Sequence, residues 1–128
     1  MRLLLDSHAF LWFAAGSDEL SLVARRQIEN PDNELFLSAA SLWEIAIKTS
    51  LGKVTLARPF EALIPEQLAA NAILILPIEL RHLAALVSLP WHHRDPFDRL
   101  LVVQAAVEQM PIVTRDPAFR EYAVEAIW

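Results

Sequence analysis

Hydrophobic residues in this chain occur as short unbroken runs, separated by longer segments with helical periodicity. Continuous apolar runs are typical of strands in parallel sheets that are covered on both faces, whereas half-exposed strands alternate apolar and polar residues. The runs therefore predict buried parallel strands. They lie at residues 3–5, 35–37, 73–76, 112–113 and 124–127.

The segments between these runs carry helix start and stop signals. Gly16 and Gly52 stand where two helices should end, and Asp95-Pro96 pairs a preferred N-cap with a preferred first helical residue. Strands that alternate with helices predict an α/β fold with a mostly parallel central sheet between helical layers. The helices are expected at residues 8–15, 21–29, 38–51, 60–71, 79–87, 95–108 and 117–121.

Length and composition predict one globular domain over residues 1–128. Hydrophobic residues make up 55% of the chain and charged residues 21%, which argues against disorder. No apolar run approaches the ~18 residues of a membrane span, and Asp6 and His8 interrupt the first run too early for a signal peptide. There is no cysteine, which excludes disulfides and thiol chemistry, so we expect a cytoplasmic protein.

Glycine content and net charge narrow the function classes further. Two glycines exclude the Gly-rich phosphate loops of the usual kinases and dinucleotide enzymes. A net charge of −5 argues against a protein that holds nucleic acid by bulk electrostatics alone. It leaves room for a nuclease whose acidic residues are neutralised by bound metal.

Four acidic residues stand at places where this fold forms sites, although each also has a local structural explanation. Asp6 and Asp116 follow two predicted strands, and sites in open α/β sheets form beyond the carboxyl ends of the strands. Either residue can instead cap the next helix, as Ser7 can in place of Asp6. Glu44 can form an i,i+4 ion pair with Lys48, worth about 0.2–0.5 kcal/mol.

The fourth acid, Asp98, falls at the third position of the helix that Asp95 caps, where it suits a capping box. Together with Asp6, Glu44 and Asp116 it can instead line one edge of the sheet. Carboxylates 4 Å apart repel by ~4 kcal/mol per pair at an effective dielectric near 20, so such a cluster must stay partly protonated or hold a cation. Oxygen ligands favour Mg²⁺ or Mn²⁺, which activate water and hold phosphodiesters.

Four motifs in a fixed order carry a family resemblance: LLLDSH at 3–8, SLWEIAIK at 41–48, HRDPFDRLL at 93–101 and VTRD at 113–116. Each is weak alone, but the ordered set is specific and covers essentially the whole chain. The sequence resembles the PIN-domain nucleases, and more narrowly the VapC toxins of bacterial type II toxin–antitoxin pairs. The resemblance implies a PIN-like three-layer αβα fold with about five strands.

The resemblance also implies an activity, a site and partners. It implies a metal-dependent endoribonuclease in which Asp6, Glu44, Asp98 and Asp116 form the site for one or two Mg²⁺ or Mn²⁺ ions. Ser7 and Thr114 match hydroxyl positions that support these acids or the water around the metal, and Thr is also common in the family where this chain has Ser7. The implied partners are an RNA substrate, a cognate antitoxin protein and a second copy of the chain in a homodimer.

Basic side chains near the acids are candidates for binding RNA phosphates, since contacts independent of base identity usually come from such side chains. Adjacent histidines cannot easily ligate one metal in regular structure, so we do not expect His92 and His93 to be metal ligands; contact with a phosphate at the mouth of the site and a purely structural place in the loop both stay open for them. The basic candidates are Arg94, Arg99, Arg115 and Lys48.

Two other function classes remain open from the residues alone. A receiver-like or phosphotransfer α/β domain also places acids and a threonine at strand ends. This chain, however, has no lysine at the end of a late strand, and His8 stands where a second acid would follow Asp6. A catalytically silent protein-binding module on the same fold is the third alternative.

Overall fold

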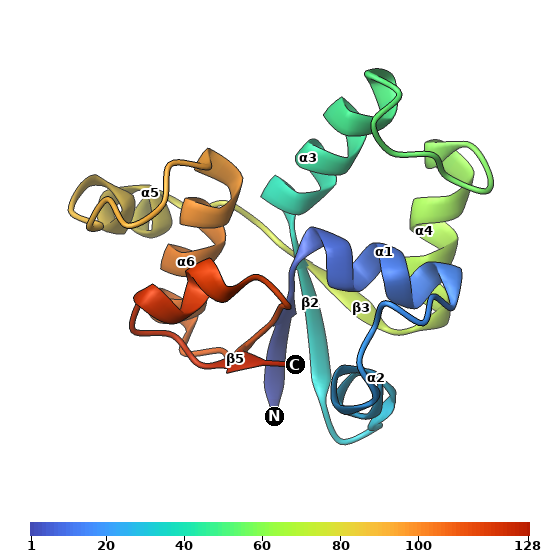
Figure 1. Cartoon of the computed structure of the whole chain (residues 1–128), viewed down its shortest axis with the longest axis horizontal. Helices are drawn as coiled ribbons and strands as arrows, with labels where there is room; N and C mark the ends of the chain where they lie inside the picture. The colour runs from blue at the N-terminus through green and yellow to red at the C-terminus, as the bar shows by residue number, and fades with distance from the viewer.

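A sheet of five parallel strands forms the centre of the computed structural model, which describes residues 1–128. The strand order is β3-β2-β1-β4-β5, so β1 lies in the middle, between β2 and β4. Figure 1 shows β2 and β3 on one side of the dark blue strand β1 and β5 on the other. The predicted parallel sheet is confirmed. The strands are β1 (Arg2–Leu5), β2 (Glu34–Ser38), β3 (Ile73–Leu76), β4 (Ile112–Val113) and β5 (Ala126–Ile127).

Six α-helices and one short 3₁₀ helix connect the strands, close to the predicted positions. Gly16 has φ 64° and ends α1, because its backbone adopts the left-handed conformation that glycine tolerates best. Asp95 caps α6, with Pro96 in the first turn. The helices are α1 (Ser7–Ala15), α2 (Leu22–Glu29), α3 (Ala39–Ser50), α4 (Phe60–Ala70), α5 (Leu80–Val87), α6 (Pro96–Glu108) and the 3₁₀ helix η1 (Pro117–Glu121).

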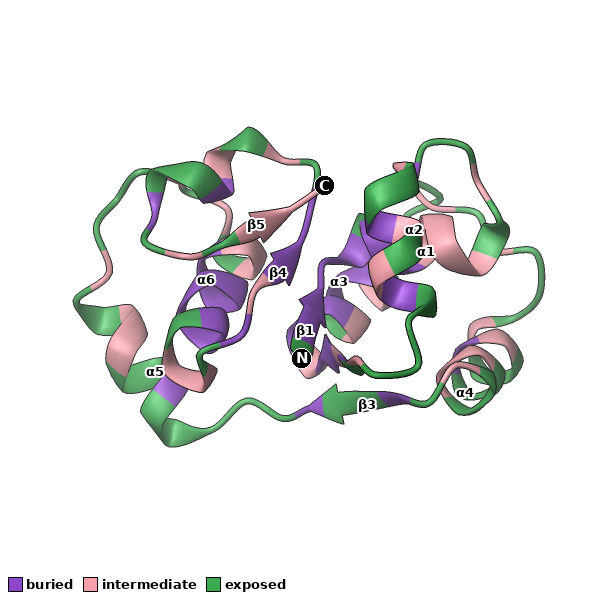
Figure 2. Ribbon diagram, turned by 90° about the horizontal axis from the view of Figure 1, so that it is seen from below, coloured by how far each residue is buried: buried purple, intermediate pink, exposed green.

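Alternate residues of the central strand serve two separate cores. Leu3 and Leu5 pack with Phe10 of α1 on one face of the sheet, and Leu4 packs with Leu101 of α6 on the other. All three leucines are fully buried, which stabilises the fold by about 1.5–3 kcal/mol each. The buried centre lies between α1, α2 and α4 on one side and α6 with α5 on the other (Figure 2). This is the predicted three-layer α/β arrangement.

Strand β3 departs from the expectation that every apolar run is covered on both faces. It pairs only with β2, at the edge of the sheet, and Leu74 and Ile75 remain 48% and 50% exposed. The prediction is wrong here because an edge strand has fewer neighbours to cover it. None of the helices is both long enough and apolar enough to cross a membrane.

The strand register brings the ends of β1 and β4 together. Leu5 is aligned with Val113, and the Asp6 N–H donates to the Val113 carbonyl at 3.1 Å. Because both strands run in the same direction, the residues that follow them emerge side by side at the carboxyl edge of the sheet. Asp6 is thereby next to the segment that begins at Thr114.

Candidate functional site

Asp6 lies at the junction of β1 and α1 with only 7% of its surface exposed. Its Oδ1 accepts the Ala9 N–H at 2.7 Å, which caps α1 as its position predicted. Burial raises the pKa of Asp6, although hydrogen bonds from Thr114 and the Ala9 N–H oppose this shift. The cap uses one carboxylate oxygen, so capping and a role in a site are compatible.

Thr114 connects Asp6 to the second strand-end acid. It is buried, and its hydroxyl both hydrogen-bonds to the Asp6 side chain and accepts the Asp116 N–H at 3.1 Å. Asp116 in turn caps η1 by accepting the Ala118 N–H at 2.9 Å. One threonine hydroxyl therefore fixes the relative positions of two acidic residues that are 110 positions apart in the sequence.

Glu44 extends from α3 toward the same region and is 6% exposed. The Ser7 hydroxyl donates to its Oε1 at 2.6 Å, and Lys48 Nζ donates to its Oε2 at 2.8 Å. The hydrogen bond to Glu44 raises the pKa of Lys48. The expected i,i+4 pair is present, but Glu44 faces the buried end of α1 and not the solvent.

Asp98 lies in the first turn of α6, and its carboxylate does not close the capping box that its position allows. Asp95 Oδ1 accepts both the Phe97 and the Asp98 N–H, at 2.9 and 3.0 Å, but the Asp95 N–H donates to His93 Nδ1 at 2.9 Å. The Asp98 carboxylate is therefore left for other contacts.

Burial is the main reason why the pKa of Asp98 rises to about 7, and the negative charges of four neighbouring acids add to it. These neighbours are Asp95, Glu44, Asp116 and Asp6, in order of decreasing effect. The predicted acids from β1, α3, α6 and the end of β4 therefore share one electrostatic environment.

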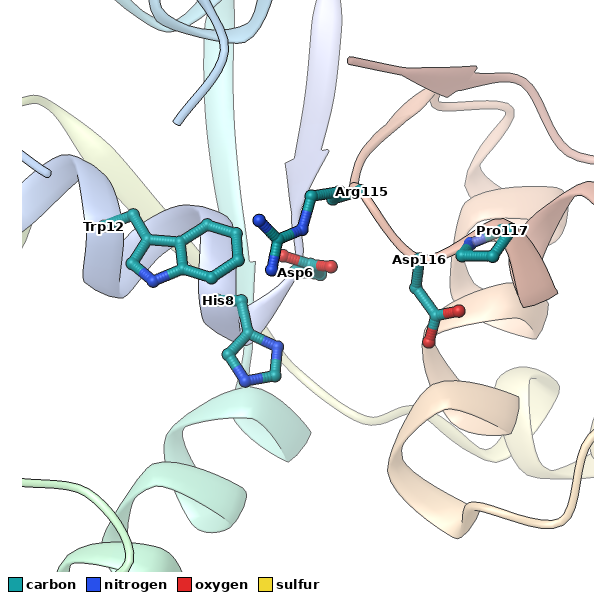
Figure 3. A pocket seen from close by; sticks show the side chains of 6 residues that line it. All are labelled: Asp6, His8, Trp12, Arg115, Asp116 and Pro117. Carbon is teal, nitrogen blue, oxygen red and sulfur yellow. The ribbon is translucent and has the colours of Figure 1, made fainter. Parts of the chain in front are cut away.

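A pocket of about 350 Å³ opens beside two of these acids, Asp6 and Asp116. Figure 3 shows Asp6 and Asp116 on its wall, with the Arg115 guanidinium between Asp6 and Trp12 and with His8 below them. The His8 and Trp12 rings stack with centroids 5.3 Å apart. This space suits water, an ion and a phosphate-sized group.

The donor chemistry of the site fits a hard divalent cation. Lys48 is the one Lys or Arg within ion-pair distance of these four carboxylates, so their negative charge is largely uncompensated. Carboxylate oxygens of Asp98 and Asp116 lie within 4.8 Å of each other, a spacing that can hold an ion. Mutually repelling carboxylates in a partly buried site are the arrangement that a bound cation relieves.

Arg99 does not serve the role expected for it, because it is buried with 4% exposure. Its guanidinium donates to the carbonyls of Leu89 and Pro90 at 3.1 and 2.8 Å, and it stacks on the Trp91 ring at 3.7 Å. The expectation that Arg99 binds RNA phosphate is therefore wrong: its donors are used to hold the loop before α6.

The other three basic candidates remain at least partly accessible. Arg115 lines the pocket, where it pairs with Glu19 at 2.6 Å and lies over the Trp12 ring. Lys48 pairs with Glu44. Arg94 is exposed and lines a different pocket, next to α5.

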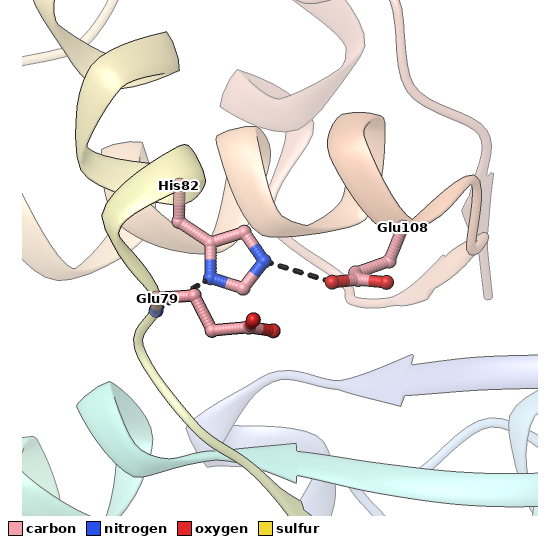
Figure 4. A group of neighbouring side chains, drawn as sticks. All are labelled: Glu79, His82 and Glu108. Carbon is pink, nitrogen blue, oxygen red and sulfur yellow. Dashed lines mark hydrogen bonds and ion pairs between the residues drawn. The ribbon is translucent and has the colours of Figure 1, made fainter.

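A second cluster with possible metal ligands, Glu79, His82 and Glu108, has a structural explanation (Figure 4). Fully buried His82 accepts the Glu79 N–H at Nδ1 and contacts Glu108 through Nε2, at 3.0 and 2.9 Å. Arg81 and Arg2 also pair with Glu108. The acids of this cluster are thus already neutralised, and the contacts join the start of α5 to the end of α6.

Sequence reasoning excluded His93 as a metal ligand and left a phosphate contact open, but it did not place this residue beside Asp98. Because His92 and His93 are adjacent, both were expected not to ligate a metal, yet their side chains lie in different places. His92 packs edge-on against Tyr122, and His93 Nε2 lies 3.4 Å from Asp98 Oδ2. The sequence feature that could have indicated this contact is the position of His93, two residues before the N-cap of α6.

Comparison with known proteins agrees with this fold. Residues 3–125 match the model of the PIN domain family. The chain is 33% identical over 120 residues to Ribonuclease VapC22 of Mycobacterium tuberculosis, which covers 93% of this chain and 90% of that protein.

Two solved structures share the fold at low sequence identity. One is VapBC2 from Rickettsia felis bound to a promoter DNA fragment, with TM-score 0.74, 13% identity, and coverage of 98% of this chain and 97% of that one. The other is FitAB bound to the IR36 DNA fragment, with TM-score 0.65, 16% identity, and coverage of 97% and 92%.

The fold, the strand-end acids and the family match define a PIN domain. The chain belongs to the PIN domain family and, within it, to the VapC proteins. This membership decides against the receiver-like alternative.

Proposed function

We propose that this protein is a metal-dependent endoribonuclease, the toxin of a type II toxin–antitoxin pair, and that residues 1–128 form a single PIN domain. The observation that carries the proposal is the convergence of Asp6, Glu44, Asp98 and Asp116 in one electrostatic environment, with Asp6 and Asp116 on the wall of a pocket. The VapC relative named as a ribonuclease supports the activity.

The acidic residues would hold one or two Mg²⁺ or Mn²⁺ ions, with Asp6, Asp98 and Asp116 as the main ligands and Glu44 assisting. Such an ion, when bound, lowers the pKa of water and stabilises negative charge on a phosphodiester. The protein itself orients these carboxylates, since most of them have fixed hydrogen-bonding partners.

Two hydroxyl groups act on the acids and not on the substrate. The Ser7 hydroxyl holds Glu44, and the Thr114 hydroxyl holds Asp6 and the backbone of Asp116. These bonds fix the carboxylates before a ligand arrives, so little reorganisation is needed when the site is filled. Arg115 and Lys48 would contact phosphates of the RNA backbone; the position of Arg115 on the pocket wall and that of Lys48 beside Glu44 support this role.

An apolar groove next to the site is the proposed place for a cognate antitoxin. It has a volume of about 450 Å³ and lies between α1 and the segment 53–57. Its apolar wall includes Leu11, Val54, Leu56 and Leu63, and it shares Trp12 with the acidic pocket. A segment bound here would reach the acids. The VapBC2 structure, a complex of a related fold, supports such a partner.

We further propose a homodimer and a cytoplasmic location. Leu80 and Val87 of α5 are 83% and 88% exposed, and exposed apolar residues of this kind often mark protein interfaces. RNA as the substrate requires a compartment that contains RNA, which favours the cytoplasm.

The activity test compares the parent with Asp6→Asn on a labelled RNA, with Mn²⁺ or with a chelator. Asparagine keeps the helix cap that Asp6 provides, so the domain should stay folded. Asp32→Asn is the matched control, since Asp32 is exposed near the amino ends of the strands. We expect cleavage by the parent and the control that requires metal, and none by Asp6→Asn. Cleavage by Asp6→Asn at the parent rate would refute the assignment.

A further inference from the structure

We propose that His93 contacts the phosphodiester group of the RNA directly, by donating a hydrogen bond from Nε2–H to a phosphate oxygen held beside the four acids. The inference rests on the proposed nuclease function and adds a substrate-binding residue to it. It is carried by the way in which the protein holds this one loop residue from several sides.

The backbone of His93 is fixed on both sides of its Cα. Its N–H donates to the Tyr122 hydroxyl at 2.9 Å, and its carbonyl accepts from Arg99 Nη1 at 3.4 Å. The same tyrosine hydroxyl donates to the Pro90 carbonyl at 3.2 Å, and Arg99 also holds the carbonyls of Leu89 and Pro90. Both Arg99 and Tyr122 are buried. The loop is therefore anchored to the core at His93.

The ring of His93 is held in one tautomer. The Asp95 N–H donates to Nδ1 at 2.9 Å, which requires a lone pair on Nδ1. The ring proton is then on Nε2. This nitrogen lies 3.4 Å from Asp98 Oδ2 but makes no hydrogen bond with any residue of the chain, and the side chain is 25% exposed. Nε2–H is thus a spare donor that points into the group formed with Asp98 and Asp116.

This tautomer favours a phosphate acceptor over a metal ion. A metal at Nε2 would need the lone pair that the proton occupies, and the ring could supply it only by giving up the bond from Asp95. The Nε2–H of His93 lies near carboxylates but makes no hydrogen bond with them, so it can donate to another acceptor. A phosphodiester drawn to the site by its cation brings acceptor oxygens.

The size of the effect follows from the kind of hydrogen bond. A hydrogen bond from a side chain to a charged acceptor contributes about 10- to 100-fold to an equilibrium or a rate. Removal of the ring should therefore lower kcat/KM by that factor. Metal binding should be unaffected, since His93 does not ligate the ion in this proposal.

The test uses His93→Ala and His93→Gln, because the glutamine amide places an N–H donor near the position of Nε2. His92→Ala is the matched control, as His92 is the neighbouring ring and packs against Tyr122 away from the acids. Two quantities are measured for each: kcat and KM for cleavage of a labelled RNA with saturating Mn²⁺, and the Mn²⁺ dissociation constant by calorimetry without RNA.

We expect His93→Ala to lose about 10- to 100-fold in kcat/KM and His93→Gln to recover most of that loss. The Mn²⁺ affinities should match the parent within twofold, as should the activity of His92→Ala. The proposal is overturned if His93→Ala keeps the parent kcat/KM, if glutamine is as defective as alanine, or if Mn²⁺ binding weakens in parallel with the activity. If the parent cleaves no RNA, both the nuclease function and this role of His93 are refuted. If the parent is active and His93→Ala is equally active, only the role of His93 is refuted.

Discussion

Substitution of Asp98 by asparagine should stabilise the protein when no metal is present. Asp98 is 23% exposed in its side chain, and burial together with the charges of neighbouring acids raises its pKa to about 7. Its ionisation at neutral pH is therefore opposed in the folded state and unopposed in the unfolded chain. Asparagine has nearly the same shape and removes the charge.

The size of this stabilisation follows from the difference between the pKa of Asp98 in the unfolded chain and in the folded protein. The pKa rises from 3.8 in the unfolded chain to about 7, and each unit corresponds to about 1.36 kcal/mol, so the upper bound is about 4 kcal/mol. Solvent screening of a partly exposed group reduces this to about 1–3 kcal/mol. The folded state binds the extra proton between these pH values, so the parent loses stability as the pH rises from about 4 to about 7.

Urea unfolding in the presence of a chelator, at pH 4.5 and at pH 8, measures this effect. At pH 8 we expect Asp98→Asn to exceed the parent by about 1–3 kcal/mol in free energy of unfolding. At pH 4.5 the two should nearly coincide, because Asp98 is protonated in the folded parent. Asp32→Asn should show no such pH-dependent gain. A gain of equal size at both pH values, or a loss at pH 8, would refute the electrostatic reasoning.

Three other substitutions test the contacts around the site. Arg99→Leu should lower the free energy of unfolding by about 2–4 kcal/mol, measured by denaturant, because it removes the hydrogen bonds from the buried guanidinium to the carbonyls of Leu89 and Pro90. Thr114→Val keeps nearly the same shape but loses the hydrogen bonds to Asp6 and to the Asp116 N–H. We expect the free energy of unfolding to fall by about 1–3 kcal/mol and the cleavage rate to decrease. Parent-like stability and a parent-like rate would count against the bridging role of Thr114. Gln104→Leu should destabilise by about 1–3 kcal/mol in thermal unfolding, since Gln104 bonds to Ser38 at the end of β2 and to the Pro77 carbonyl after β3.

Local signals were enough to predict most of the fold. Asp95-Pro96 marks the start of α6 and Gly16 the end of α1 because caps depend on residues within one turn. Buried apolar runs located the strands. The burial of β3 was predicted wrongly because the sequence does not reveal which strand lies at the edge.

The candidate site was predictable in part for a similar reason. Asp6 and Asp116 follow parallel strands, so the topology alone brings them to one edge of the sheet. The contacts of Arg99 and His93 were not predictable, because both residues bond to Tyr122, which is 23 and 29 positions away in the sequence. A charged residue near a motif can face the substrate or the interior, and only packing decides.

Calorimetric titration of Mn²⁺ tests most directly whether the four carboxylates share a divalent ion. The parent should bind Mn²⁺, and Asp6→Asn, Asp98→Asn and Asp116→Asn should each weaken the binding at least about tenfold, since each removes a negatively charged ligand. Asp32→Asn should bind Mn²⁺ as the parent does. Absence of Mn²⁺ binding by the parent, or unchanged affinity in all three site variants, would contradict the shared-ion site.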